Sequence, residues 1–150
     1  MKTFKRFVEQ SYSGVPFGTY HPIADLNAAA GDAQLTRQVV DAVEKYADRL
    51  YKAVGIDVEF TRHFLDRVND ERNKKQITVA ELIRLFKQSY KKHGKKIAQL
   101  GPDAEAVLND IQTDVNMPFA LKWDGKELDL VAKTVMRKKN FATSNQKLTF

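Results

Sequence analysis

The chain contains no cysteine, so disulfide bonds, thiolate nucleophiles and cysteine-ligated zinc sites are excluded. Its three histidines, His21, His63 and His93, are too scattered to form a recognisable metal-ligand pattern. We therefore assign no metal site and no cofactor. No apolar run approaches the ~18 residues that a membrane-spanning helix requires, which argues against a membrane partner. The start, MKTFKRFVEQ, lacks the apolar core of a secretory signal.

The charge balance is basic. The chain has 25 Lys and Arg against 19 Asp and Glu, a formal net charge of +6, and a sequence pI of about 9.5. With 43% hydrophobic residues and a length of 150, the composition is that of one globular domain with a sizeable core. A basic domain of this kind favours polyanionic partners, above all nucleic acid.

Composition divides the chain into two parts. Residues 3–10 have the spacing of a short amphipathic helix, and residues 11–33 are interrupted by Gly and Pro. We interpret residues 1–33 as a leader and an irregular segment that wraps the domain. Residues 34–150 are predicted to form a single α+β domain.

The first half of that domain reads as helices around one strand. Apolar residues at helical spacing predict a helix over 34–54, and the alternation in IDVEF predicts a strand over 56–60. A second helix is expected over about 61–72. Thr78 and Glu81 form a capping-box pattern at the start of a third. Pro102 and the spacing of the apolar residues after it predict a fourth helix, over about 103–111.

The last part has the period of β-structure. Asp124-Gly125 is a two-residue hairpin signal, which would place Lys122 opposite Glu127 and Leu121 opposite Leu128. Trp123 would then face the core. One long strand is expected over 128–137 and a short one over 147–150. The expected fold is α+β, with N-terminal helices packed on a small C-terminal antiparallel sheet.

The stretch FTRHFLDRVNDERN holds the best candidate site. On a helix, His63 and Arg67 would project from one side at the border of the core. A histidine suits proton transfer near neutral pH, and an arginine offers a fork of donors to phosphate oxygens. Together they suit attack of an RNA 2′-hydroxyl on its own phosphate, and we see no carboxylate cluster that would hold a catalytic metal. The alternative is a solvated helix surface.

Further basic residues extend the predicted nucleic-acid surface. On the helix that begins near residue 78 and the run KKHGKK they are Arg84, Lys87, Lys91, Lys92, Lys95 and Lys96. On the last long strand, Lys133 and Arg137 are expected on the open sheet face, with Lys138 and Lys139 beyond. The alternatives are a solubilising lysine face and an ordinary polar sheet face.

These residues resemble a known family. The stretch FTRHFLDRVNDERNKKQITVAELIRLF is similar to the strand and helices of phage RegB-type endoribonucleases, within the RelE, colicin and barnase-like group of small ribonucleases. The resemblance rests on His63 to Arg67, Ile77-Thr78 and the helix that follows. It implies metal-independent cleavage of mRNA, free or on the ribosome, that leaves a 2′,3′-cyclic phosphate. His63 would be the acid or base and Arg67 a phosphate clamp.

One departure concerns the second histidine, which those enzymes carry near the position of Lys87. Here the nearest histidine is His93, about two helical turns further on. Either His93 or a lysine takes that role, or activity is altered or lost. The predicted catalytic set is therefore His63, Arg67, His93 and Lys133.

The N-terminus MKTFKRFVEQ resembles the leader of internal head proteins of tailed phages, with Glu9 as the candidate cleavage position. Three functions stay open: an endoribonuclease in the host cytoplasm, a virion protein that binds packaged DNA or capsid in the virion interior, and a catalytically inactive RNA- or partner-binding domain. RNA cleavage in EDTA, lost on substitution of His63, separates the first from the others.

Overall fold

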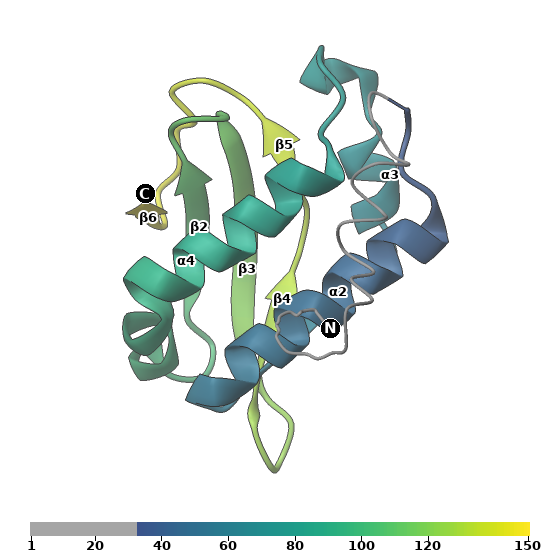
Figure 1. The fold of residues 1–150 in the computed structure, drawn as a ribbon. Coiled ribbons are helices and arrows are strands. Elements are labelled where there is room, and N and C mark those ends of the chain that lie inside the picture. Colours follow the sequence, from purple (N-terminus) through teal and green to yellow (C-terminus); the bar gives the residue numbers. More distant parts are fainter. Residues whose placement is uncertain (1–32) are drawn as a thin grey trace.

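The computed structural model describes residues 33–150 (Figure 1). The expectations for the leader, including the helix over 3–10, the wrapping segment, Glu9 and His21, lie outside these residues. Within residues 33–150, no helix combines the length and apolar content that crossing a bilayer requires.

Helix α2 (Arg37–Tyr51) begins at Thr36, whose hydroxyl accepts a hydrogen bond from the Val39 N–H at 3.2 Å. Its apolar residues recur every three or four positions, so Val40, Val43 and Ala47 form a buried stripe. A 3₁₀ turn, η2 (Lys52–Val54), extends it to Gly55, whose positive φ of 76° suits a residue without a side chain. The predicted helix over 34–54 is confirmed, with a start at Arg37.

Helix α4 (Val79–Leu100) begins with the predicted capping box. The Thr78 hydroxyl accepts from the Glu81 N–H at 3.1 Å, and the Glu81 carboxylate accepts from the Thr78 N–H at 2.9 Å. The two long helices meet at a buried polar contact, where the Tyr51 hydroxyl lies 2.7 Å from the Ser89 hydroxyl. This contact fixes α4 beside α2.

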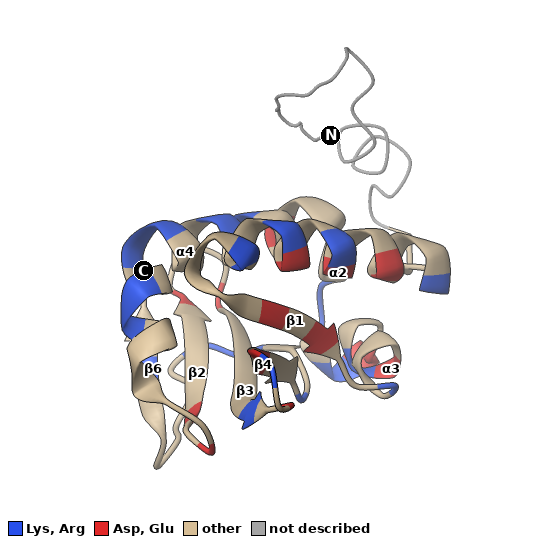
Figure 2. Cartoon of the chain, turned by 90° about the horizontal axis from the view of Figure 1, so that it is seen from below, with Lys and Arg blue, Asp and Glu red and all other residues tan. Residues whose placement is uncertain are grey.

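Six strands form one mixed sheet in the order β1-β4-β3-β2-β6, with the short β5 also paired to β3. The strands are β1 (Ile56–Phe60), β2 (Glu105–Asp110), β3 (Val115–Trp123), β4 (Leu128–Ala132), β5 (Met136–Arg137) and β6 (Gln146–Thr149). Helices α2 and α4 lie on one face (Figure 2). The α+β class is confirmed, but the sheet is not purely antiparallel, because β1 runs parallel to β4 and β6 parallel to β2.

The core lies between the helices and the sheet. Every second side chain of each long strand points at the helices, as the pleat of a strand requires. The sheet contributes an unbroken apolar layer to the buried core, including Ala106, Leu108, Met117, Phe119, Leu121 and Leu130. The opposite side chains, such as Asp57, Asn116 and Asp129, belong to the other face.

The predicted helix after Pro102 is wrong, because residues 105–110 form strand β2. The sequence AVL has three apolar residues in a row, which fits a helix turn as well as a strand that is buried on both faces. Here Ala106 and Leu108 face the helices, and Val107 is 1% exposed on the other side. Ile111, the last residue of the predicted helix, is 65% exposed.

The predicted hairpin is present, but its register is shifted by two residues. Leu121 lies opposite Leu130 and Lys122 opposite Asp129. The turn is longer than expected because the Asp124 carboxylate accepts from the N–H groups of Lys126 and Glu127, at 2.8 and 2.9 Å. A shift of two keeps each side chain on its face. Trp123 is 59% exposed, so its predicted burial is wrong.

Two other expected elements are shorter in the structure. The helix predicted over 61–72 is a five-residue helix, α3 (Phe64–Val68), followed by the 3₁₀ turn η3 (Glu71–Asn73). The long strand predicted over 128–137 ends at Ala132 and resumes as β5. The short strand at the end of the chain is confirmed as β6.

Candidate nucleic-acid interface

The parallel pairing of β1 with β4 places His63 and Lys133 at the same edge of the sheet. The carboxyl ends of parallel strands lie side by side, so the segments that leave them start together. Here the Thr61 N–H donates to the Ala132 carbonyl at 3.2 Å, and the Thr61 hydroxyl donates to the Lys133 carbonyl at 2.9 Å. The segment that leaves β1 begins at Thr61, and His63 lies two residues further on.

A cleft of about 870 Å³ opens at this edge. Its size is within the ~300–1,000 Å³ of ordinary ligand sites. Eight Lys or Arg residues and two Asp residues line it, together with one histidine. The charged lining residues are His63, Arg67, Asp70, Arg72, Lys74, Lys75, Asp114, Lys133, Arg137, Lys138 and Lys139. The excess of positive charge suits a polyanion.

His63 sits at the N-terminal end of α3 as its capping residue. The helix is anchored beneath it by Phe64, whose ring stacks on that of Phe60 with centroids 4.0 Å apart. The His63 side chain is exposed, and its ring makes no hydrogen bond with any of residues 33–150. The imidazole is therefore available to a ligand in the cleft.

Arg67 lies one turn later on the same helix, and 48% of its side chain is exposed. Its guanidinium is 3.9 Å from Asp70, a loose ion pair. Asp70 is held mainly by Arg72, whose guanidinium donates to it at 2.7 Å, and this bond lowers the pKa of Asp70 to about 2. Asp70 is thus ionised, and its main partner is Arg72. Because the ion pair between Arg67 and Asp70 is loose, Arg67 can turn toward a phosphate.

Lys133 lies directly after β4 and also lines the cleft. Its ammonium forms an ion pair with Glu105 at 2.9 Å, and both side chains are nearly half exposed. Exposed pairs of this kind contribute little, about 0–1 kcal/mol. Lys133 can therefore exchange Glu105 for a phosphate oxygen at small cost.

Arg137 is not available to a ligand, which corrects its assignment to nucleic-acid binding. The five N–H groups of its guanidinium are all used inside the protein. Two meet Glu81, at 2.7 and 2.8 Å, and three meet the carbonyls of Lys75, Gln76 and Thr113. Because the long strand breaks after Ala132, Arg137 points toward α4 and not, as expected, toward the open sheet face.

Asn73 completes the wall of the cleft. It is 5% exposed and links α3 to β5, since its amide donates to the Arg67 carbonyl at 2.9 Å and its side-chain oxygen accepts from the Arg137 N–H at 2.9 Å. Burial raises the pKa of Glu81, but the hydrogen bonds from Arg137 and the Thr78 N–H outweigh it, so the net pKa is lowered. The cleft thus rests on a connected polar frame.

Two predicted site residues lie elsewhere. His93 is on α4 and does not line the cleft; its ring nitrogen is 2.9 Å from the Thr149 carbonyl of β6. It cannot be the proton-transfer partner of His63 in this arrangement. Arg84 forms an ion pair at 2.8 Å with Asp110, which is fully buried. Its guanidinium neutralises a core carboxylate, so Arg84 is a structural residue.

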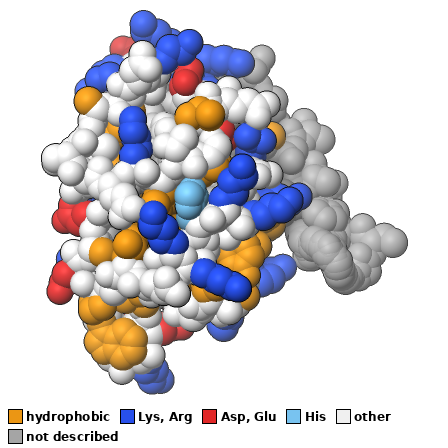
Figure 3. Space-filling view, turned by 90° about the vertical axis from the view of Figure 1, so that its left-hand side faces the viewer, with side chains coloured by type: hydrophobic (Ala, Val, Ile, Leu, Met, Phe, Trp, Pro, Cys, Tyr) orange, Lys and Arg blue, Asp and Glu red, His pale blue; other side chains and the backbone are white. Residues whose placement is uncertain are grey.

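The other α4 residues form a separate basic face, made by Lys87, Lys91, Lys92, Lys95 and Lys96. All five side chains are exposed, and within residues 33–150 none pairs with a carboxylate. Figure 3, which looks onto β6 and the end of α4, shows Lys and Arg prevailing over Asp and Glu on this side. The α4 lysine face and the cleft are two surfaces, not one.

Sequence reasoning missed Arg72, Lys74 and Lys75, which also line the cleft. The signal was present in the run NDERNKKQ, but the predicted helix over 61–72 ended in the middle of it and left the two lysines outside. It also missed a group of carboxylates outside the cleft, Asp57, Glu127 and Asp129, whose oxygens have the spacing of cation ligands.

No family model, no curated protein and no solved structure matches the chain.

Proposed function

We propose that the cleft binds RNA and cleaves it as an endoribonuclease, by attack of a 2′-hydroxyl on the adjacent phosphate. The observation that carries the proposal is that His63, Arg67 and Lys133, chosen for their chemistry, line one cleft although they are up to 70 residues apart in sequence. The resemblance to RegB-type enzymes supports the same reaction, with mRNA as substrate and no metal in the chemical step.

In the proposed reaction, His63 takes the proton of the 2′-hydroxyl as its oxygen forms a bond to phosphorus. The bond from phosphorus to the 5′-oxygen breaks, and that oxygen takes a proton from solvent. The products are a 2′,3′-cyclic phosphate and a 5′-hydroxyl. Arg67 and Lys133 neutralise the extra negative charge that develops on the phosphoryl oxygens in the transition state.

The surrounding cations supply affinity. Lys74, Lys75, Lys138 and Lys139 ring the cleft and would contact neighbouring phosphates along a single strand. Such contacts release counterions, so binding should weaken steeply as the salt concentration rises.

The test uses purified full-length protein and a 5′-labelled RNA in EDTA. Wild-type protein is expected to leave 2′,3′-cyclic phosphate ends, and His63→Ala to lose at least ~10²-fold in rate, the usual size of a general-base contribution. His93→Ala is the matched control and should retain the wild-type rate. A substrate with a 2′-deoxyribose at the cut site should resist cleavage. Absence of cleavage by wild-type protein on every RNA tested would overturn the proposal.

The pH profile tests the single-histidine mechanism. One base acting without a protein acid gives a kcat/KM that rises with pH to a plateau, whereas two histidines acting as base and acid give a bell-shaped profile. We expect the plateau form. A bell-shaped profile, in which kcat/KM falls at both low and high pH, would show that a second protein group donates the proton to the 5′-oxygen. Lys133 is the candidate for that group.

The α4 lysine face favours a second candidate function, a virion protein that binds packaged DNA. This face lies outside the cleft and requires no chemistry. The expected signature is binding to double-stranded DNA that falls steeply with salt and is weakened by Lys91→Gln with Lys95→Gln, without any turnover. Peptides of this chain in washed virions, starting at Gln10, would support it.

A further inference from the structure

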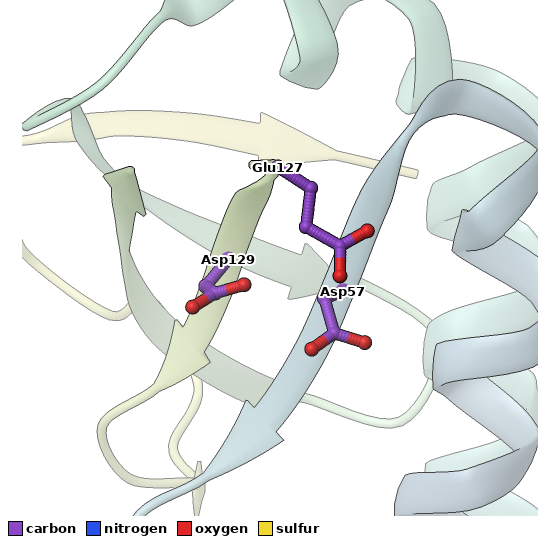
Figure 4. Close-up of side chains that lie close together, drawn as sticks. All are labelled: Asp57, Glu127 and Asp129. Atoms are coloured by element: carbon purple, nitrogen blue, oxygen red, sulfur yellow. The ribbon is translucent and has the colours of Figure 1, made fainter. Parts of the chain in front are cut away.

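Three carboxylates gather on the sheet face that α2 and α4 leave uncovered. Asp57 of β1 and Asp129 of β4 are direct neighbours in the parallel pairing of these strands. Glu127 lies two residues before Asp129, so its side chain leaves the chain on the same side. One oxygen from each of the three lies within 4.8 Å of the others, and Figure 4 shows the group converging between the two strands.

The second observation concerns Asp129 itself. The residue is 7% exposed, and one of its carboxylate oxygens is buried without a hydrogen-bond partner among residues 33–150. Buried carboxylate oxygens are nearly always hydrogen-bonded or bound to a cation, because losing water without replacement is costly. This oxygen belongs to the carboxylate that lies among the three.

In the part of the chain that the structure describes, no basic side chain compensates the group. Within residues 33–150 none of the three carboxylates forms an ion pair with Lys or Arg. Lys122 stands opposite Asp129 in the hairpin register, but its ammonium lies beside Asp103, at 3.9 Å. The chain as a whole has a net charge of +6, yet these three carboxylates lie together without a positive side chain. A bound cation would supply the positive charge.

We propose that Asp57, Glu127 and Asp129 bind one divalent cation, and that Ca²⁺ fits best. Oxygen ligands of Ca²⁺ lie at about 2.3–2.6 Å, so two of them can be up to about 5 Å apart. For Mg²⁺, at about 2.0–2.1 Å, the limit is about 4 Å. The three oxygens lie within 4.8 Å of one another, inside the limit for Ca²⁺, so one Ca²⁺ can bind all three without movement of the strands. Mg²⁺ demands near-ideal octahedral geometry and gives up its waters reluctantly, so it should bind more weakly.

The cation ties β1 to β4 at positions that would otherwise repel each other. It also gives a partner to the Asp129 carboxylate, one of whose buried oxygens has none among residues 33–150. None of its three ligands lines the basic cleft, so the site is separate from the proposed RNA chemistry and does not rest on it.

The test is calorimetric titration of the full-length protein, stripped with EDTA and dialysed, with CaCl₂ and separately with MgCl₂. We expect one saturable Ca²⁺ site, weaker binding of Mg²⁺, and a higher Tm in Ca²⁺ than in EDTA. Asp129→Asn and Asp57→Asn keep the side-chain shape but remove a charged ligand, and each should weaken Ca²⁺ binding at least about tenfold. Asp103→Asn, an exposed carboxylate outside the group, should bind as wild type.

Two outcomes would overturn the proposal. One is the absence of saturable Ca²⁺ binding up to about 10 mM, beyond the weak end of natural protein sites. The other is Ca²⁺ binding that survives unchanged in folded Asp129→Asn and Asp57→Asn proteins, as judged by circular dichroism. RNA cleavage plays no part in either readout, so failure here leaves the endoribonuclease proposal untouched, and the reverse also holds.

Discussion

At the scale of single residues, Arg137 shows how position decides between two roles that sequence cannot separate. The run MRKK contains one arginine and two lysines of the same charge. Lys138 and Lys139 are exposed at the cleft. The guanidinium of Arg137 instead ties β5 to the segment after η3, to α4 and to the turn between β2 and β3. A planar fork with five donors can satisfy so many acceptors, and a lysine ammonium with three cannot.

Replacement of Arg137 by Lys should therefore destabilise the fold although it keeps the charge. We expect a loss of about 3 kcal/mol in the free energy of unfolding, because a lysine leaves at least two of the five acceptors without a donor, at about 1–3 kcal/mol each. Urea denaturation measures it. Lys138→Gln, at the next residue along the chain, is the control and should change stability by less than about 0.5 kcal/mol. Equal stability of the two variants would contradict the structural role of Arg137.

At the scale of elements, helix α2 protects the outer edge of strand β1. The Asp48 carboxylate accepts from the Val58 N–H at 2.9 Å, and the Glu44 carboxylate accepts from the Phe60 N–H at 2.7 Å. These N–H groups point away from the rest of the sheet and would otherwise be free to pair with another chain. Glu44 and Asp48, four residues apart on one face of α2, therefore satisfy these N–H groups and block the pairing of another strand with β1.

Glu44→Ala should open that edge. Loss of the acceptor for the Phe60 N–H should cost about 1–2 kcal/mol, the price of an unsatisfied partly buried donor. Glu44→Gln retains an acceptor oxygen and should cost much less. Denaturation measures the difference, and light scattering at high concentration should detect more self-association in Glu44→Ala alone. If both variants behave alike, charge and not the hydrogen bond is what matters at this position.

Elements that depend on residues close in sequence could be predicted from the sequence. Elements that depend on pairing with distant segments could not. The capping box at Thr78 and the helical stripe of α2 depend on residues close in sequence. Strand β2 is a strand because β3 and β6 flank it, and nothing within residues 105–110 shows that. The hairpin register depended on how the Asp124 side chain folds back on its own turn. His63 and Arg67 were found from their chemistry, whereas Asp129 became visible as a candidate ligand only once β1 lay beside β4.

At the scale of the whole molecule, charge is separated into a basic cleft and an acidic group, and the acidic group makes stability depend on pH. A hydrogen bond shared with Asp48 of α2 is the main cause that raises the pKa of Asp57 to about 7. Burial is the main cause that raises the pKa of Asp129 to about 6. The charged groups that add to these shifts are Asp48, Glu59, Asp124 and Glu127.

A carboxyl that holds its proton more tightly when folded stabilises the fold at low pH and loses that contribution as pH rises through the folded pKa. For Asp57 the window runs from the ordinary pKa of 3.8 to about 7. In EDTA, we expect Asp57→Asn to match the wild-type Tm near pH 4 and to exceed it above pH 7. Thermal unfolding across this range measures it. A Tm difference that does not vary with pH would rule out the shifted carboxyl as its cause.

The pairing of β1 with β4 also sets the order in which the chain can fold as it is made. Ile56 pairs with Leu128, so 128 − 56 = 72 residues must follow before the partner strand exists. At ribosomal rates of about 5–20 residues per second, this is a wait of roughly 4–14 s. During that time α2 can already cover one side of β1, while its other side has no strand to pair with. Misfolding in the cell should therefore begin at β1, and slower translation of residues 61–127 should increase it.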